Sequence, residues 1–231
     1  MIYPIRINKY LADKKICSRR EADKLIERGV VKINGKLAQL GDKVQENDNV
    51  FIEGDLKNLV YLAFNKPKGI VTNTPQEGES CIADILQFNY EVFALGRLDK
   101  ESRGLILLTN DGRVTDRLLN PIYYHEKEYV VKVNKPIDDN FIRTVENGIK
   151  LDDGYVTKKC ILKKIDDFTF SIILTEGKNR QIRRMCRFMG FGIADLKRVR
   201  TMNIELGDLE VGKYRMISGE ELEVFLSMLN L

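Results

Sequence analysis

Apolar residues near the start of the chain have the spacing of short helices. They recur at i, i+3 and i+4 over residues 7–11, which predicts an amphipathic helix. Ser18 and Glu21 have the spacing of a capping box, so a second helix is expected to begin there and to continue to about residue 28. Gly29 follows, and glycine commonly ends helices. The chain is therefore predicted to begin with a pair of short helices.

The apolar pattern then changes to one typical of strands. Val30–Ile33 and Lys36–Leu40 lie on either side of Asn34-Gly35, the dipeptide that favours a two-residue hairpin turn. A β-hairpin is therefore predicted here. Val50–Ile52 is predicted to add a further short strand.

Residues 54–58 are polar and are interpreted as a linker that divides the chain into residues 1–58 and residues 59–231. In the second part strand-like apolar runs dominate, at Val60–Phe64, Val92–Leu95, Leu105–Leu108, Tyr129–Val133 and Thr169–Leu174. Helical patterns are found near Ile82–Leu86, Thr115–Leu119, Asp139–Asn147, Arg180–Met189 and Glu220–Leu229. Strands and helices that alternate irregularly favour an α+β domain over a doubly wound sheet.

The composition excludes several common kinds of active site. The chain has one histidine, His125, and it has no G-x-S-x-G, P-loop, G-x-G-x-x-G or H-E-x-x-H motif. Its four cysteines lie far apart, so neither a zinc site nor a disulfide framework is indicated. We therefore expect no cofactor and no metal, and chemistry that depends on carboxylate, tyrosine and arginine side chains.

The charges indicate a nucleic-acid partner. The net charge of +4 is modest, but eight basic residues lie between Glu176 and Arg200, namely Lys178, Arg180, Arg183, Arg184, Arg187, Lys197, Arg198 and Arg200. Phe188, Met189 and Phe191 interrupt them, a mixture that favours phosphate and stacking contacts over an ordinary solvated face. No stretch approaches the roughly 20 apolar residues of a membrane span, and the first residues lack a signal-peptide core. A cytoplasmic protein without a membrane partner is expected.

Asp99 is the strongest candidate for a catalytic group. It lies in a glycine-bracketed loop between two apolar runs, with Arg97, Lys100 and Arg103 as its basic neighbours in the sequence. A carboxylate in such a loop at a strand end is an unusual choice for structure alone. An Asx-turn or an ion pair with Arg97 is the structural alternative.

Residues 5–53 resemble the S4 RNA-binding domain. The resemblance is carried by Arg6-Ile7-Asn8-Lys9-Tyr10-Leu11, by Cys17-Ser18-Arg19-Arg20-Glu21-Ala22 and by the turn Val31-Lys32-Ile33-Asn34-Gly35-Lys36. It implies a surface for structured RNA that is lined by Arg6, Lys9, Arg19, Arg20 and Lys24. A helical pair with ordinary solubilising charges is the alternative.

The rest of the chain resembles the pseudouridine synthases that modify ribosomal RNA, in the branch with a leading S4 domain. Besides the Asp99 loop, the resemblance is carried by Asn65-Lys66-Pro67-Lys68-Gly69, by His125-Glu126-Lys127-Glu128-Tyr129 and by Glu176-Gly177-Lys178-Asn179-Arg180-Gln181-Ile182-Arg183-Arg184-Met185. It implies a catalytic domain with a mixed, mostly antiparallel β-sheet. The last two blocks, with Thr157-Lys158-Lys159-Cys160, are most similar to large-subunit synthases of the F type.

The same resemblance implies roles for individual residues. Asp99 is the essential carboxylate, Arg183 pairs with it, and Tyr129 stacks on the uracil and takes the C5 proton. Substrate contacts are implied for Arg97, Ile182, Lys66, Lys68, Arg180 and Arg184. Other interpretations stay open: a phosphate contact for Arg183, strand packing for Tyr129, support of the active-site loop for Lys66 and Lys68, and a structural or RNA contact for His125.

The implied reaction accounts for these residue types. Conversion of uridine to pseudouridine breaks the bond from C1′ to N1, turns the base and joins C1′ to C5, without any change in redox state. Positive charge develops on the ribose as the bond opens, and a carboxylate beside the sugar stabilises it. Asp99 could also attack C1′ or remove a proton from C2′, and the sequence does not decide between these routes.

The expected partner is a structured stem-loop in ribosomal RNA, 23S in particular, with small-subunit ribosomal RNA or transfer RNA as alternatives. A non-catalytic RNA-binding ribosome assembly factor is the alternative from another class. A nucleoside hydrolase or glycosylase would need a water-activating base, and no motif supplies one. Because no exposed apolar stripe is evident, we expect a monomer.

Overall fold

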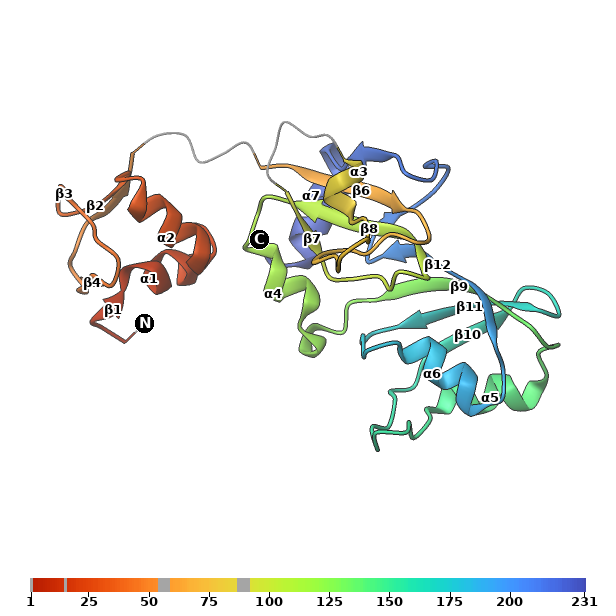
Figure 1. Cartoon of the computed structure of the whole chain (residues 1–231). Helices are drawn as coiled ribbons and strands as arrows, with labels where there is room; N and C mark the ends of the chain where they lie inside the picture. Colours follow the sequence, from red (N-terminus) through yellow and green to blue (C-terminus); the bar gives the residue numbers. More distant parts are fainter. Residues whose placement is uncertain (1, 15, 54–58, 87–91) are drawn as a thin grey trace.

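The computed structural model describes residues 2–14, 16–53, 59–86 and 92–231. The predicted linker, residues 54–58, lies outside the described residues. The described chain consists of a small N-terminal unit and a larger C-terminal unit (Figure 1).

Short helices and very short strands make up the N-terminal unit. Its elements are β1 (Ile5–Arg6), α1 (Ile7–Asp13), α2 (Arg19–Glu27), β2 (Val31–Ile33), β3 (Lys36–Leu37), β4 (Lys43–Val44) and β5 (Val50–Ile52). The hydroxyl of Ser18 accepts a hydrogen bond of 3.2 Å from the backbone N–H of Glu21, so Ser18 caps α2 as expected. The predicted hairpin is formed by β2 and β3, and its second strand is shorter than predicted. Asn34 and Gly35 form its turn with φ of 51° and 81°, a conformation for which this pair is favoured.

The N-terminal unit has a hydrophobic core of its own. The buried side chains that form it come only from residues 5–44, and none of them is from the C-terminal unit. The five basic residues predicted to bind RNA are all exposed: Arg6, Lys9, Arg19, Arg20 and Lys24. Arg20 and Lys24 are one turn apart on α2, so they share a face of the helix.

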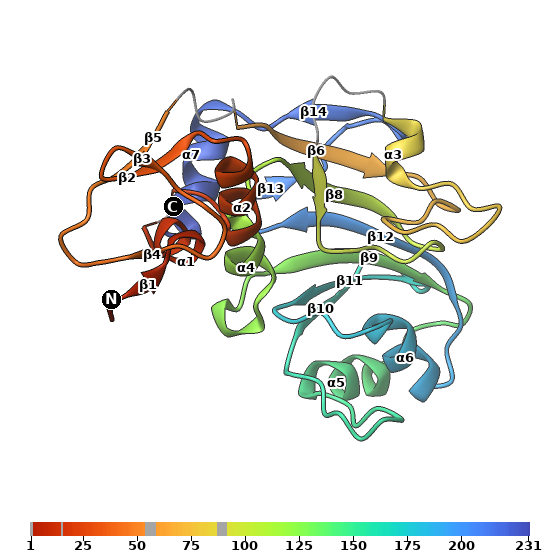
Figure 2. The same ribbon diagram turned by 60° about the vertical axis from the view of Figure 1, so that its left-hand side comes forward.

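The C-terminal unit is built on a nine-stranded sheet. Its strands are β6 (Tyr61–Lys66), β7 (Phe93–Leu95), β8 (Arg103–Thr109), β9 (Lys127–Val133), β10 (Ile161–Lys164), β11 (Thr169–Leu174), β12 (Ile193–Thr201), β13 (Ile204–Glu205) and β14 (Tyr214–Met216). The main order is β10-β11-β9-β12-β8-β6-β14, which can be followed from bottom to top in Figure 2, and β7 and β13 pair with β8 and β12. Every pairing is antiparallel except that of β8 with β12. The predicted mixed, mostly antiparallel sheet is confirmed.

Helices cover the sheet at several places. They are α3 (Ile82–Ile85), α4 (Val114–Leu119), the 3₁₀ turn η1 (Pro121–Tyr123), α5 (Asp139–Asn147), α6 (Gln181–Phe188) and α7 (Gly219–Met228). Figure 2 shows α5 and α6 together against β9, β10 and β11, where they share one core that includes Phe141, Phe170 and Met185. Alternate residues of β6 and β8 enter two cores on opposite faces of the sheet, one with α4 and α7 and the other with α3. Burial on both faces explains why these two strands are continuous apolar runs.

The parallel pairing of β8 with β12 depends on a glycine. Gly104 lies opposite Arg198, and its φ is 103°. A Cβ atom on Gly104 would lie 2.2 Å from the carbonyl oxygen of Arg198, so no larger residue fits without moving the backbone. This close approach joins the two antiparallel halves of the sheet.

The main element that the sequence did not predict is β12. From the sequence, Lys197, Arg198 and Arg200 are expected to belong to one basic run that contacts RNA. Arg198 is instead only 4% exposed, and its Nε donates a hydrogen bond of 2.6 Å to the carbonyl oxygen of Leu105. The expectation of a phosphate contact is therefore wrong for Arg198. Within the described ranges no helix is both long and apolar enough to cross a bilayer.

The division at residue 58 remains a prediction, and truncation tests it. Because the core of residues 5–44 is separate from those of the larger unit, a chain that lacks residues 1–58 is expected to keep one cooperative thermal transition. Circular dichroism at 222 nm would follow the melt beside that of the full chain. Loss of the transition in the truncated chain would contradict the division.

Candidate active site

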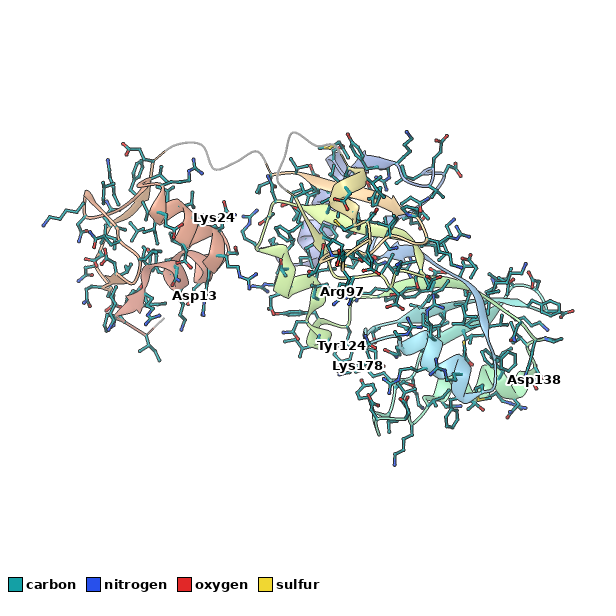
Figure 3. The ribbon with its side chains drawn as sticks, viewed as in Figure 1. Asp13, Lys24, Arg97, Tyr124, Asp138 and Lys178 are labelled. Carbon is teal, nitrogen blue, oxygen red and sulfur yellow. The ribbon has the colours of Figure 1, made fainter. Side chains whose placement is uncertain are left out.

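A cavity of about 390 Å³ lies where the Asp99 loop, β9 and the start of α6 meet. Residues 96–99, 118–121 and 174–183 form most of its wall, and Lys127 and Tyr129 of β9 also line it. Arg97 and Lys178, both labelled in Figure 3, reach it from distant parts of the sequence. This volume lies in the range of cavities that bind small molecules or single nucleotides.

Asp99 is paired with two arginines of the segment that opens α6. Its Oδ2 lies 3.4 Å from Nε of Arg183 and 3.7 Å from Nη1 of Arg180. The expected pairing of Arg183 with Asp99 is confirmed. Nη2 of Arg183 donates to the carbonyl oxygen of Glu101 at 3.0 Å and to the hydroxyl of Ser102 at 2.9 Å, which fixes the guanidinium beside the loop. Nε is buried and makes no hydrogen bond to the described residues, so it remains directed at the carboxylate.

The basic neighbours of Asp99 in the sequence have other partners. Lys100 binds Glu79 at 2.8 Å, and Arg103 binds Asp195 at 2.6 Å. Arg97 is exposed and lines the cavity. The alternative of an ion pair between Arg97 and Asp99 has no support among the described residues, because the ion pairs of Asp99 are with Arg180 and Arg183.

The segment after β6 holds the Asp99 loop in place. The hydroxyl of Thr72 donates to the carbonyl oxygen of Leu98 at 2.8 Å and accepts from the N–H of the same residue at 3.0 Å. The N–H of Gly69 donates to the carbonyl oxygen of Lys100 at 2.8 Å. These bonds lie on both sides of Asp99 and fix its backbone. Thr72 has no role predicted from the sequence, and its nearness to the Asn65–Gly69 block is the one local signal that points to it.

Lys66 supports this segment from inside. Its side chain is fully buried, and its ammonium donates to the carbonyl oxygens of Pro67 at 2.9 Å and Ile70 at 2.5 Å. Burial lowers the pKa of Lys66 to about 8. A buried ammonium does not agree with the predicted substrate contact of Lys66. It agrees with the alternative role, support of the active-site loop. Lys68 is half exposed and lies 3.9 Å from Glu101.

Tyr129 and Ile182 both line the cavity. Tyr129 lies in β9 between Ile172 of β11 and Arg198 of β12, and its ring packs partly against two hydrophobic cores. Ile182 lies in the first turn of α6, is 5% exposed and belongs to the core under α6. Arg180, just before α6, has a φ of 49°, a costly conformation for arginine that places its side chain at the cavity.

Glu176 organises the loop that carries these residues. It is 3% exposed, and its carboxylate accepts hydrogen bonds from the side chain of Gln181 at 2.7 Å and the N–H of Lys158 at 3.0 Å. The hydroxyl of Tyr155 also donates to it. These bonds connect the start of α6 to residues 155–158. The sequence analysis included Glu176 in a block without assigning it a role.

Lys127 is a second lysine at the cavity, and it is partly buried. It lies two residues before Tyr129, so both side chains leave β9 on the same face. Its Nζ donates to the carbonyl oxygen of His125 at 3.3 Å. Burial, together with the charge of Arg198, lowers the pKa of Lys127 to about 8. Burial also lowers the pKa of His125.

Two other predicted RNA contacts bind protein carboxylates. Arg184 does not line the cavity, and it pairs with Asp152 and, at 2.7 Å, with Asp153. Arg200 is bound by Glu126 and Glu128, each at 3.0 Å. The substrate contact of Arg184 therefore stays a prediction that requires exchange of partners. Among the described residues no cluster of histidine, cysteine, aspartate and glutamate could hold a metal ion.

Substitution of Thr72 tests the support of the Asp99 loop. In Thr72→Val the shape is kept, but the N–H and the carbonyl oxygen of Leu98 lose their partner in a buried place. We expect the free energy of unfolding to fall by about 1–3 kcal/mol. Urea denaturation would measure it, and Thr72→Ser, which keeps the hydroxyl, is the control. Equal stability of the two variants would show that these bonds contribute nothing.

The lowered pKa of Lys127 predicts a pH dependence of stability. Because the folded chain releases this proton near pH 8 and the unfolded chain near the ordinary value of 10.5, the free energy of unfolding of the wild type rises between those pH values. Lys127→Met should be more stable than the wild type at pH 7, by up to about 3 kcal/mol, and the difference should shrink as the pH approaches 10.5.

Denaturant melts of both proteins at several pH values would give this difference. Lys66 has a similarly lowered pKa but is present in both proteins, so its titration cancels. A difference that stays constant from pH 7 to pH 10.5 would contradict the burial of a charged Lys127.

Comparisons with known proteins agree with this geometry. Residues 60–188 match the family model described as RNA pseudouridylate synthase, and residues 5–50 match the S4 domain. The dual-specificity RNA pseudouridine synthase RluF of Escherichia coli (strain K12) is 45% identical over 224 residues, which cover 94% of this chain and 77% of the relative. The ribosomal large subunit pseudouridine synthase B of Bacillus subtilis (strain 168) is 33% identical over 94% of both chains.

A solved structure confirms the fold over nearly the whole chain. The crystal structure of a pseudouridylate synthase covers 97% of this chain and 99% of its own length, with a TM-score of 0.72 and 27% identity. The predicted S4 domain, the predicted resemblance to F-type synthases and the predicted enzyme class are all confirmed by these matches. The chain therefore belongs to the RNA pseudouridylate synthase family, among the members with an N-terminal S4 domain, and it is an isomerase.

Proposed function

We propose that this enzyme isomerises a specific uridine in a structured stem-loop of 23S ribosomal RNA, with Asp99 as the essential carboxylate. The observation that supports Asp99 most is its position at the cavity, where its Oδ2 lies 3.4 Å from the buried Nε of Arg183. The cavity volume of about 390 Å³ suits a single nucleotide that has left its helix.

The two arginines beside Asp99 position its carboxylate, which is proposed to lie against the sugar. As the bond from C1′ to N1 opens, positive charge develops on the ribose, and Asp99 stabilises it. On one route Asp99 attacks C1′, the uracil leaves as an anion and turns, and C5 then displaces the carboxylate. On the other, Asp99 removes a proton from C2′ after the bond breaks and returns it when C1′ joins C5. Both routes end with loss of the C5 proton and protonation of N1.

Tyr129 and Ile182 are proposed to hold the uracil between them. Both line the cavity, one from β9 and the other from α6, and an aromatic and an aliphatic surface together suit a flat base. Tyr129 is also proposed to take the C5 proton after the new bond has formed. The packing of Tyr129 against the two cores limits the movement of its side chain. The ring is therefore proposed to be in position before the substrate binds.

Arg97 and Arg180 are proposed to bind the RNA around the flipped nucleotide. Removal of a base from a stem costs a few kcal/mol, which stacking and phosphate contacts offset. Arg97 is exposed at the rim of the cavity and has no carboxylate partner among the described ion pairs, so it is free to fill the gap that the base leaves. Lys68 and Arg184 are proposed to contact the backbone nearby.

The S4 domain is proposed to supply affinity and register through Arg6, Lys9, Arg19, Arg20 and Lys24. All five are exposed, and lysine and arginine contacts to phosphate make RNA binding sensitive to salt. A monomeric, cytoplasmic enzyme is proposed. Because the RluF relatives are named as having dual specificity, transfer RNA and small-subunit ribosomal RNA belong among the substrates to be tested.

Tritium release from RNA labelled at uridine C5 tests the proposal, because formation of the bond from C1′ to C5 expels that hydrogen. Wild type should release tritium from 23S ribosomal RNA, and Asp99→Asn, which keeps the shape and removes the charge, should release none. Asp208→Asn changes an exposed aspartate outside the cavity and should be fully active.

Filter binding of the same RNA separates chemistry from affinity. Asp99→Asn is expected to bind as tightly as the wild type. Release from transfer or small-subunit RNA alone would overturn the choice of 23S RNA. Binding without release from any of the three RNAs, by the wild type, would favour a non-catalytic assembly factor.

A further inference from the structure

An exposed aromatic turn beside the cavity has no part in the reaction described above. It follows α4 and consists of η1 and Tyr124 (Figure 3). Pro121 and His125, on either side of Tyr123 and Tyr124, line the cavity. The side chain of Tyr124 is 60% exposed, although it lies next to a site that binds a base.

Contacts within the turn define its conformation. The side chain of Asn120 accepts a hydrogen bond of 3.2 Å from the N–H of Ile122 and so caps η1. The ring of Tyr123 stacks on that of His125 with 5.9 Å between the centroids. Tyr124 has a φ of 55°, a conformation that is costly for a bulky residue and is maintained here by its neighbours.

A lysine lies against the ring of Tyr124. Nζ of Lys158 is 4.1 Å from the ring centroid, which is a cation–π distance. The backbone of Lys158 is fixed by its hydrogen bond to the buried Glu176, so this ammonium is anchored to the loop that precedes α6. Lys178, at the cavity wall, makes a similar contact with Tyr155 at 4.5 Å.

We propose that Tyr124, supported by Lys158, is a stacking site for a second, unpaired base of the RNA, next to the uridine in the cavity. This inference rests on the proposed function. One side of the ring faces an ammonium and the ring is largely exposed, so a flat partner has room to stack on it. Every base has such a face, and stacking on an aromatic residue is tolerant of sequence.

The surrounding charges are positive and favour a nucleotide, which carries phosphate, over an uncharged flat ligand. Lys158 lies 4.1 Å from the ring of Tyr124, and Arg117 lies 5.9 Å from the ring of Tyr123, so two cations flank the place where a base at Tyr124 would carry its phosphates. The site continues the cavity through Pro121 and His125, so its occupant is a neighbour of the target in the same strand. A base held there stays out of the helix and keeps the stem open during the reaction.

Kinetics with Tyr124 variants test the site. The substrate is the C5-tritiated ribosomal RNA transcript from which the wild type releases tritium. Because one stacked base contributes about a tenfold gain in affinity, Tyr124→Ala should raise KM about tenfold and leave kcat within about twofold. Tyr124→Phe keeps the stacking surface and should behave as the wild type.

Phe168→Ala is the matched control. Phe168 is also an exposed aromatic residue, 42% accessible, but it lies just before β11, at the opposite end of that strand from the cavity. Its KM should be unchanged. A KM of Tyr124→Ala equal to that of the wild type would overturn the stacking site, and so would an equal rise in Tyr124→Phe, because the hydroxyl would then be the group that binds.

A fluorescent base reports on the site without catalysis. An RNA hairpin that contains the mapped uridine, with 2-aminopurine as its neighbour, is bound to Asp99→Asn. Stacking on Tyr124 should change the fluorescence on binding, and the change should be lost when Tyr124→Ala is added and kept with Tyr124→Phe. If the fluorescence does not change on binding to Asp99→Asn or to either of the two double variants, the inference is overturned. Failure of the proposed function is a different result, because the wild type itself would then release no tritium.

Discussion

The backbones of β8 and β12 approach so closely at Gly104 and Arg198 that only glycine fits between them. This contact joins two antiparallel half-sheets through their one parallel pairing. The Asp99 loop leads into β8 and α6 leads into β12, so the same contact sets the distance between Asp99 and Arg183. Tyr129 lies in β9, which pairs with β12 on its other side. The cavity is thus located where the two half-sheets join, and its geometry depends on how they are joined.

The arrangement of charges follows from this geometry. Asp99 is the carboxylate to which Arg180 and Arg183 are directed, whereas two other arginines near it are bound by other groups of the fold. Arg103 is held by Asp195, and Arg198 by the carbonyl oxygen of Leu105. An arginine with a fixed protein partner stabilises the sheet and does not compete for the Asp99 carboxylate. The arginines around Asp99 are oriented by Ser102, Glu101 and the Glu176 network. On the proposed function, the electrostatic field at the sugar is therefore set before the substrate binds. Preorganisation of this kind avoids reorientation of dipoles during the reaction.

Local patterns in the sequence were sufficient for much of the fold. The capping Ser18, the Asn34-Gly35 turn and the apolar runs of β6, β8, β9 and β11 each depend on neighbouring residues, and each was predicted. Strand β12 was missed because its lysine and arginines were taken as part of a basic run that contacts RNA. The partner of Arg198 is a carbonyl oxygen 93 residues away in the sequence, which no local pattern reveals. Thr72 and Lys127 were missed for the same reason. A threonine hydroxyl that holds Leu98, or a partly buried lysine at a cavity wall, is recognised only when distant segments have been brought together. Asp99 could be found early because its loop has a distinctive sequence of its own.

The separation of binding from chemistry has a physical basis in this chain. The S4 domain has a hydrophobic core of its own, and its basic residues are exposed. RNA can therefore bind there without disturbing the cavity. The cavity has room for about one nucleotide, and on the proposed function a uridine reaches it only after leaving its stem. Contacts beyond the cavity therefore have to offset the free energy of that opening. On the proposed function, the basic residues of the S4 domain bind the RNA, and Arg97 and the rim of the cavity stabilise the opened stem. Asp99 contacts only the sugar of the nucleotide that has already entered the cavity. A substitution at any one of these levels changes a different step, which is why affinity, opening and chemistry can be examined separately in one protein.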